Sequence, residues 1–340
     1  MQRLQYIGSK YPLLGWLKQS ILDNTGYRSL VGVRISDLFA GTGIVSHLFR
    51  SEGAIVTAND AELYSSIITK AIVTCDFNDT VDAFIAETNA ELEGNAHTNC
   101  VGFLTKQYSP FEDNKRMFFT LDNAKRIDYI RQRIEEADLS SNDRIFALAS
   151  LLVMADTVSN VPAVYGSYLK SFKPKALKPL VLKPVHTMKV PGTVGSTVTC
   201  QDVLTSVFDP VDVVYMDPPY NDRQYSKNYF PLNVIAKTPA EQASTVLHGK
   251  TGIPSDCFLS AFCKKGDVES AFTSVLSTLK CTWLFLSYSN EGLVSKQRMI
   301  DLLSGYGTVT VLERPYKRFK SFSYNEGDET VEYLFCLKYA

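Results

Sequence analysis

The segment VVYMDPPYNDRQYSKNYF (213–230) places an acid, two prolines and a tyrosine directly after an apolar run. Proline cannot donate a hydrogen bond to a sheet, so a buried strand should end here. Asp217 and the carbonyls of Pro218 and Pro219 then remain as acceptors, and Tyr220 offers a flat ring for stacking. Acceptors beside a ring suit the exocyclic amino group of a base. The alternative interpretation is a turn in which the aspartate caps a helix.

A glycine-rich segment, DLFAGTG (37–43), follows another apolar run and precedes a helical pattern. Glycines let the backbone approach a ligand, and a helix N-terminus can hold polar groups. Asp60 lies seventeen residues after Gly43, where an acid can accept hydrogen bonds from ribose hydroxyls. Ser46 stands where a dinucleotide-binding fingerprint has its third glycine, which argues against NAD. A nucleoside-cofactor site is indicated, with a simple strand-to-helix turn as the alternative.

The elements that would position these residues alternate between strands and helices. Short apolar runs rich in β-branched and aromatic residues predict strands at 34–39, 54–58, 198–203, 212–216, 283–288, 308–312 and 331–339. Helical patterns occupy 11–22, 43–50 and 61–73. The alternation predicts an open, mainly parallel α/β sheet. The last two strands have no clear helix between them, so we expect an antiparallel hairpin at one edge.

One long block interrupts this alternation. Residues 76–191 contain helical patterns, such as 124–136 and 143–158, but no convincing strand. The block is too long for a loop within a sheet. We therefore predict a first part of the main domain at 1–75, an inserted and mostly helical subdomain at 76–191, and a second part of the main domain at 192–340.

Composition narrows the class of protein. Seven cysteines at scattered spacings without a C-x-x-C pair, together with four separated histidines, predict neither disulfides nor a metal site. No apolar run reaches the roughly 18 residues of a membrane span. The first ten residues lack the apolar core of a signal peptide. We expect a cytoplasmic protein with reduced thiols.

At this point the chain resembles a known family. DPPY combined with DLFAGTG is similar to the amino-methyltransferases that use S-adenosylmethionine. The order YIGSK, FAGTG, an insertion and DPPY resembles the D12 class, or alpha group, of DNA adenine-N6 methyltransferases, which includes the Dam methylases. Further segments resemble the FokI- and NlaIII-type modification methylases: RMFFTLDNAKRIDYIRQRIE, VYGSYLKSFKPKALKPL, YNDRQYSKNYF, LSYSNEG and YKRFKS.

The resemblance implies a Rossmann-like S-adenosylmethionine-dependent methyltransferase fold and roles for individual residues. Lys10 would pair with the methionine carboxylate of the cofactor, and Asp60 would hold its ribose. Asp202 would accept from the cofactor adenine, although a solvent-facing acid at a strand end is the alternative. The other residues implied in the cofactor pocket are Tyr6, Asp37, Phe39, Gly41, Gly43 and Val203.

The same resemblance implies the catalytic chemistry. The target adenine must leave the duplex, because its N6 is otherwise paired and stacked. Asp217 and the Pro218 carbonyl would accept the two N6 hydrogens, and Tyr220 would stack on the flipped base. Pro219 completes the motif. Methyl transfer would be a direct in-line displacement without a covalent enzyme intermediate.

Charge along the chain suggests where DNA binds. Residues 71–105 hold six acids and no lysine or arginine, whereas residues 157–201 hold six lysines and no acid. The implied DNA-binding residues are Lys170, Lys173, Lys175, Lys178, Arg223, Lys227, Tyr229, Lys317, Arg318 and Lys320. Solvated surface lysines are the alternative for part of this set. The insertion would then be the target-recognition subdomain, contacting phosphates without reading sequence.

These inferences predict a site-specific, adenine-specific DNA methyltransferase acting on double-stranded DNA. It would be a monomer encoded by a bacterium or phage, either an orphan or the partner of a restriction endonuclease without a stable complex. The alternative substrate is adenine N6 in structured RNA. A more distant alternative is a non-enzymatic nucleic-acid-binding protein that retains a cofactor fold.

Overall fold

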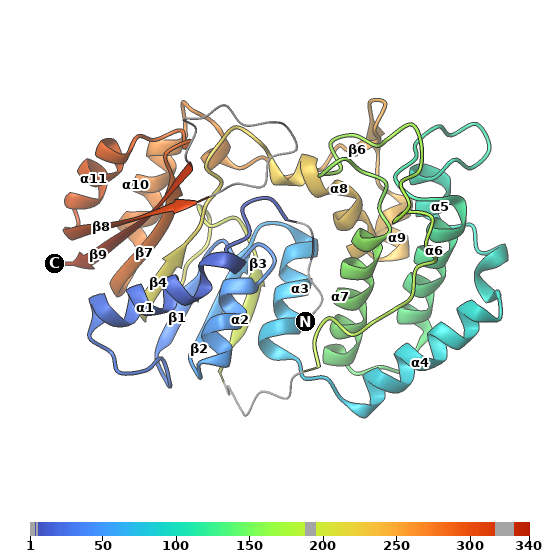
Figure 1. Ribbon diagram of the computed structural model, residues 1–340, viewed down its shortest axis with the longest axis horizontal. Helices are drawn as coiled ribbons and strands as arrows, with labels where there is room; N and C mark the ends of the chain where they lie inside the picture. Colours follow the sequence, from blue (N-terminus) through green and yellow to red (C-terminus); the bar gives the residue numbers. More distant parts are fainter. Residues whose placement is uncertain (1–3, 5, 188–194, 317–329) are drawn as a thin grey trace.

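The computed structural model describes residues 4, 6–187, 195–316 and 330–340, and it has two lobes side by side (Figure 1). One lobe is built on a seven-stranded sheet in the order β3-β2-β1-β4-β7-β9-β8. Its strands are β1 (Arg34–Asp37), β2 (Ile55–Asp60), β3 (Thr197–Cys200), β4 (Val211–Met216), β7 (Cys281–Ser289), β8 (Gly307–Tyr316) and β9 (Thr330–Tyr339). Each strand predicted from the sequence is present.

The sheet is mixed. Strands β3, β2, β1, β4 and β7 pair in parallel, and β9 pairs antiparallel with both β7 and β8. The predicted parallel sheet with an antiparallel edge hairpin is therefore confirmed. Consecutive residues of β4 alternate between two buried clusters: Val213 belongs to one and Val214 to the other. This alternation means that the central strands are covered on both faces.

Helices supply the two covering layers. Helices α1 (Leu14–Thr25) and α2 (Ile44–Ser51) pack on one face, and α10 (Val268–Thr278) and α11 (Lys296–Ser304) pack on the other (Figure 1). The predicted helix at 11–22 begins as a 3-10 turn containing Pro12, where the missing N–H does no harm. Within the part of the chain that the structure describes, no helix is long and apolar enough to cross a membrane.

The second lobe is mostly helical. Its helices are α4 (Asp79–Glu93), α5 (Phe103–Tyr108), α6 (Leu121–Glu136), α7 (Ser141–Thr157), α8 (Tyr225–Ala236) and α9 (Pro239–Ala243), with a small hairpin of β5 (Leu247–His248) and β6 (Ile253–Pro254). Thr120 and Ser140 cap α6 and α7, because their hydroxyls accept backbone N–H groups of the first turn. Helix α3 (Leu63–Thr74) lies between this lobe and the sheet (Figure 1).

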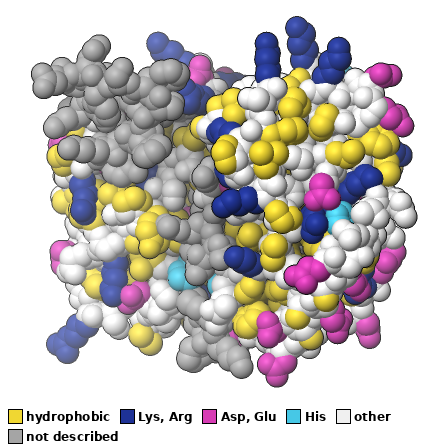
Figure 2. Space-filling model, turned by 45° about the vertical axis from the view of Figure 1, so that its right-hand side comes forward, with side chains coloured by type: hydrophobic (Ala, Val, Ile, Leu, Met, Phe, Trp, Pro, Cys, Tyr) yellow, Lys and Arg dark blue, Asp and Glu magenta, His cyan; other side chains and the backbone are white. Residues whose placement is uncertain are grey.

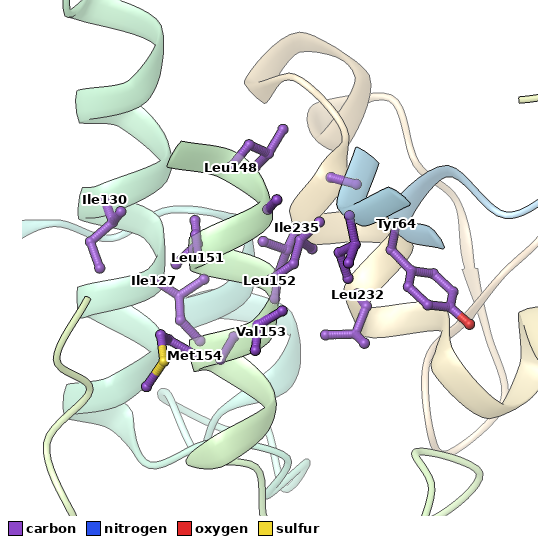
Figure 3. Packing of buried hydrophobic residues seen from close by; sticks show 14 of the residues in the cluster. Tyr64, Ile127, Ile130, Leu148, Leu151, Leu152, Val153, Met154, Leu232 and Ile235 are labelled. Atoms are coloured by element: carbon purple, nitrogen blue, oxygen red, sulfur yellow. The ribbon is translucent and has the colours of Figure 1, made fainter. Parts of the chain in front are cut away.

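Helix α8 follows the DPPY segment in sequence but belongs to the core of the helical lobe. Figure 3 shows Leu232 and Ile235 of α8 lying between Leu152 of α7 and Tyr64 of α3. All four side chains are fully buried in one apolar cluster. The core of this lobe therefore draws on chain segments from both sides of residue 191, and the division at 76 and 191 stays a prediction.

The structure corrects the assignment of Tyr229 to the DNA-binding residues. Helix α8 begins at Tyr225, and its backbone is non-helical only at Tyr229, two residues before Pro231. Tyr229 is fully buried, and its hydroxyl accepts the backbone N–H of Ile7 at 2.9 Å. Tyr229 therefore anchors the N-terminal segment and does not offer a surface to DNA.

Because α8 joins the two lobes by apolar burial, shortening Leu232 should weaken the whole fold. We expect Leu232→Ala to cost about 2–5 kcal/mol of unfolding free energy, since a buried leucine is replaced by a cavity. Urea unfolding followed by circular dichroism measures it. Leu177→Ala is the matched control, because the Leu177 side chain is 64% exposed. Equal midpoints for the two variants would contradict this account of α8.

Candidate active site

The loops after β1, β2 and β4 meet at the carboxyl edge of the sheet. Leu38 N–H donates to the Tyr215 carbonyl at 3.1 Å, and Ala40 N–H donates to the Asn59 carbonyl at 2.9 Å. A cavity of about 1280 Å³ opens above this edge, and Pro162 and Ala163 of the helical lobe line it as well. Such an edge is where open α/β sheets bind their ligands.

The structure brings together almost all of the predicted catalytic and cofactor residues. Those that line the cavity are Tyr6, Lys10, Asp37, Phe39, Gly41, Asp60, Asp202, Val203, Asp217, Pro218, Pro219 and Tyr220. Gly43 is not among the lining residues. It sits behind the cavity as the N-cap of α2, with φ of +72°, and a Cβ there would lie 2.8 Å from Thr69 Oγ1 of α3. Gly43 therefore lets α3 approach the glycine turn.

The glycine turn is held by Asp60 and shaped by Tyr6. Gly41 has φ of +53°, and a Cβ there would meet the Tyr6 ring at 3.1 Å. Asp60 accepts the N–H of Gly41 at 2.7 Å and the N–H of Glu62 at 2.9 Å. Burial raises the pKa of Asp60 to about 6, although these hydrogen bonds oppose the rise. Asp60 thus couples the end of β2 to the turn that follows β1.

Asp37 presents an unpaired acceptor beside the cavity. Its Oδ2 accepts from the Ser46 hydroxyl at 2.6 Å, whereas no described residue donates to its Oδ1. Only 1% of Asp37 is exposed, and burial raises its pKa to about 7. A buried acceptor without a partner indicates a ligand that donates hydrogen bonds or carries positive charge. Ser46, the residue that departs from the dinucleotide fingerprint, is the one that orients Asp37.

The DPPY loop is arranged as a set of acceptors. Asp217 follows β4 directly, and its Oδ1 accepts from Lys10 Nζ at 2.8 Å and from the Tyr220 hydroxyl at 2.7 Å. Among the described residues, no group donates to Asp217 Oδ2 or to the Pro218 carbonyl. Two neighbouring acceptors with no donor of their own are therefore available at the cavity.

The segment LSYSNEG (286–292) supports this loop from behind. The Tyr220 carbonyl accepts the N–H of Leu293 at 2.8 Å and the hydroxyl of Tyr288 at 3.5 Å. Gly292 packs so closely that a Cβ would lie 2.1 Å from the Tyr288 ring. A larger residue at 292 would displace Tyr288 and hence the loop that carries Asp217.

Lys10 has protein partners that the sequence did not predict. Its ammonium lies 2.8 Å from Asp217 and 3.2 Å from Glu332 of β9, and it is only 4% exposed. Burial works to lower the pKa of Lys10, but the two carboxyl groups outweigh it and raise that pKa. Its contact with a methionine carboxylate stays a prediction. Glu332 could have been found, because an acid inside the apolar run VEYLFCL needs a buried partner.

Other lining residues also escaped the sequence interpretation. Tyr225 of α8 lines the cavity, and its ring lies 5.3 Å from that of Tyr6, which in turn stacks on Tyr229 at 5.0 Å. Asp202 uses its Oδ1 to accept the N–H of Leu204 at 3.1 Å, so it also shapes its own turn. The predicted role of Asp202, accepting a hydrogen bond from the cofactor adenine, stays a prediction.

The predicted DNA-binding residues divide by exposure. Lys170, Lys178, Arg223 and Lys227 are exposed, whereas Lys173 and Lys175 are half-buried. Lys173 donates to the carbonyls of Val161, at 2.6 Å, and Pro162, so it holds the loop that reaches the cavity. Lys317, Arg318 and Lys320 lie outside the described residues.

The mixed sheet, the glycine turn and the acid at the end of β2 are those of the S-adenosylmethionine-dependent methyltransferase fold. A sequence model of the D12 class N6 adenine-specific DNA methyltransferase family matches residues 6–299, and the chain belongs to this family. It is therefore an adenine-specific DNA methyltransferase.

Three relatives match nearly the whole chain. Type II methyltransferase M.CviAII of Paramecium bursaria Chlorella virus 1 is 40% identical over 337 residues, with 98% of both chains covered. M.NlaIII of Neisseria lactamica is 34% identical, with 98% of this chain and 99% of that protein covered. M.FokI of Planomicrobium okeanokoites is 31% identical, and the match covers 98% of this chain and 52% of that protein.

The cavity fits the cofactor of this class. S-adenosylmethionine carries a sulfonium, an ammonium and ribose hydroxyls, which are positive charges and hydrogen-bond donors. The unpaired Asp37 Oδ1 and the Asp60 carboxylate offer matching acceptors at the cavity. The enzyme uses S-adenosylmethionine as its methyl donor.

The raised pKa of Asp37 predicts that cofactor affinity depends on pH. Ionised Asp37 attracts a cation, so affinity should fall as pH falls through about 7, by roughly tenfold per pH unit. Calorimetric titration with S-adenosylmethionine between about pH 5 and 8 measures the change. Asp37→Asn should remove the decrease in affinity near pH 7. Only the decrease near pH 6, caused by protonation of Asp60, should remain. A wild-type affinity that does not vary over this range would refute the assignment.

Proposed function

We propose that this enzyme methylates N6 of one adenine, flipped out of duplex DNA at a specific site, as the modification enzyme of a type II restriction system. The observation that carries the proposal is the acceptor pair formed by Asp217 Oδ2 and the Pro218 carbonyl. Neither oxygen accepts a hydrogen bond from a described residue, and both belong to residues that line the cavity. An amino group with two hydrogens is the substituent that satisfies two such acceptors.

The mechanism follows from what these residues do to the amino group. Asp217 and Pro218 accept its two hydrogens, which turns the nitrogen lone pair away from the ring system. S-adenosylmethionine supplies an electrophilic methyl group on its sulfonium. The chain holds the nitrogen in line with that group, so that the N–C bond forms as the S–C bond breaks and no protein nucleophile is needed. The nitrogen then gives up one proton, which Asp217 accepts late or passes to water. Lys10 holds Asp217 in place through a contact of 2.8 Å.

The aromatic lining receives the flipped base. Tyr220 has its hydroxyl tied to Asp217 and Glu332, so its ring cannot rotate freely. Lys10 Nζ lies 4.8 Å from the centroid of the Tyr220 ring, and the centroid of the Tyr288 ring lies 5.1 Å from it. Tyr225 adds a second ring at the cavity wall. We propose stacking on Tyr220 as the contact that holds the adenine, since base stacking on aromatic side chains is worth about 1–3 kcal/mol.

Exposed cations around the cavity would hold the DNA backbone. Arg223 lines the cavity and is exposed, and Lys227 follows it on α8. Lys170 and Lys178 are exposed on the segment that connects α7 to β3. Figure 2 shows lysine and arginine side chains standing out along the top of the helical lobe, with acidic side chains gathered toward its bottom. This separation supports a DNA-binding face on residues 76–191 and α8.

The biological setting is also a proposal. The three relatives carry the names of type II methyltransferases and come from two bacteria and a virus. We propose a monomer in the cytoplasm, encoded by a bacterium or phage, that needs no stable complex with an endonuclease. One adenine occupies one cavity, so a single chain suffices.

Transfer of label from S-adenosylmethionine tests the substrate. Duplex DNA and structured RNA are incubated separately with the enzyme, then digested to nucleosides. N6-methyl-deoxyadenosine from DNA alone is the expected product. Label found only in the RNA digest would establish the alternative substrate and overturn the proposal. Absence of transfer to either would favour a binding protein that has lost catalysis.

Removing the carboxylate of Asp217 should abolish most of the transfer. We expect Asp217→Ala to lower kcat by about two to three orders of magnitude, because the amino group loses an electrostatic acceptor. Cofactor affinity should change little. Asp222→Ala is the matched control, since Asp222 is exposed five residues along the same loop. Retention of wild-type kcat by Asp217→Ala would show that the catalytic assignment is wrong.

Phosphate contacts predict a change in salt dependence. Arg223→Ala and Lys170→Ala should each reduce the slope of log affinity against log salt by about 0.9, because each removes one phosphate contact. Fluorescence anisotropy with duplex DNA measures the slope. Lys18→Ala is the control, since Lys18 pairs with Glu52 at 2.7 Å on the sheet lobe. Unchanged slopes for both test variants would exclude these residues from the DNA interface.

A further inference from the structure

A buried cluster of four polar side chains lies behind the acceptor pair. Glu332 enters it from β9, Asp217 and Tyr220 from the DPPY loop, and Lys10 from the N-terminal segment. Side-chain exposure is 6% for Glu332, 4% for Lys10 and 18% for Asp217. All four side chains line the cavity, and Asp217 is more exposed than Lys10 and Glu332.

If both carboxyl groups of the cluster are ionised, the cluster has one proton too few for the hydrogen bonds that its distances indicate. Lys10 has three N–H donors, which serve the Gly8 carbonyl at 3.3 Å and the two carboxyl groups. The Tyr220 hydroxyl has one hydrogen, yet its oxygen lies 2.7 Å from Asp217 Oδ1 and 2.6 Å from Glu332 Oε1. A single hydrogen cannot serve both contacts in good geometry, and a proton on one of the two carboxyl groups would complete the second hydrogen bond.

Position decides which carboxyl group holds that proton. Lys10 lies closer to Asp217, at 2.8 Å, than to Glu332, at 3.2 Å, and Asp217 is the more exposed of the two. Both features favour a proton on Glu332, the more buried carboxyl group and the one farther from the ammonium. One ammonium with two carboxylates would leave a net negative charge buried, whereas a neutral Glu332 balances the cluster.

The remaining neighbours of Glu332 do not neutralise it. Arg314 is its partner across the ladder on β8, but the guanidinium lies over the Trp16 ring at 5.8 Å. Ser289 is its partner on β7. Tyr215 of β4 is another titratable group nearby, and its hydroxyl is engaged with Ser287 at 2.9 Å. The acids Asp37 and Glu291 line the same cavity and add no positive charge.

We propose that Glu332 is a positioning residue that acts as a neutral acid. It donates its proton to the Tyr220 oxygen, the Tyr220 hydroxyl donates to Asp217 Oδ1, and Lys10 joins both carboxyl groups. Asp217 Oδ1 is thereby saturated, and Oδ2 is the oxygen left to accept the amino group. The inference rests on the proposed function and names the group that orients its catalytic acceptor.

The surroundings of Glu332 agree with a neutral state. Burial raises the pKa of Glu332, Lys10 opposes the rise and Asp217 adds to it. A carboxyl group with a raised pKa is protonated at low pH and loses its proton as pH rises. The ordered cluster is therefore present below that pKa and is lost above it.

Glu332→Gln tests the proposal, because the amide keeps a donor and an acceptor but cannot ionise. We expect kcat within about threefold of the wild type at neutral pH, with the decline of kcat at high pH removed. Glu332→Ala removes the donor, so kcat should fall by about 10–100-fold while the KM values for cofactor and DNA stay within about threefold. Glu313→Gln is the matched control, since Glu313 is exposed on β8 and pairs with Lys296.

Infrared spectroscopy of the free enzyme gives a readout that does not depend on activity. The wild type minus Glu332→Gln difference should contain the C=O stretch of a protonated carboxyl group at neutral pH, and the Glu313→Gln difference should contain a carboxylate band instead. A carboxylate band in the Glu332→Gln difference would overturn the proposal. So would equal pH profiles in the wild type and Glu332→Gln. Failure of the proposed function would instead appear as a wild type that does not methylate DNA.

Discussion

The structure depends on one buried ammonium group. Lys10 is 4% exposed and lies within 3.2 Å of both Asp217 and Glu332. A buried lysine is costly unless its charge is matched by partners in good geometry. This requirement draws the N-terminal segment, the end of β4 and strand β9 to a single point. Those segments are far apart in the sequence, so the ammonium ties the catalytic loop to both ends of the chain.

The helical lobe is joined to that point by aromatic packing. Tyr229 of α8 holds Ile7 through its hydroxyl and stacks on Tyr6, and Tyr6 packs against the glycine turn at Gly41. The cofactor wall therefore depends on a helix whose apolar face is buried in the other lobe. These contacts therefore connect the wall of the cavity in the sheet lobe to the packing of the helical lobe.

The sequence was sufficient for the strands, the edge hairpin and the cavity motifs, because those features depend on local patterns. Apolar runs predict strands, and DLFAGTG and DPPY occur where strands end. The features that the sequence did not predict depend on contacts between residues far apart in the chain. Tyr229 looks like a surface aromatic in its local context, but tertiary packing buries it. Lys173 looks like a phosphate contact, but its ammonium holds the carbonyls of Val161 and Pro162. Glu332 acquires its role only when β9 is placed beside β7.

The charge of the cavity explains how one site separates a cofactor from a nucleic acid. Asp37, Asp60 and Asp217 line it together with Glu62, whose pKa burial raises to about 8, and Lys10 is their nearest cation. The carboxyl groups of the cavity that are ionised attract a sulfonium and repel phosphates, whereas Glu62 with its raised pKa is largely neutral near pH 7. Only an uncharged base can enter it, so the phosphates must be held outside by exposed cations. In the proposed mechanism, the extruded base is the part of the DNA that reaches the acceptor pair, and its amino group binds the pair through two hydrogens.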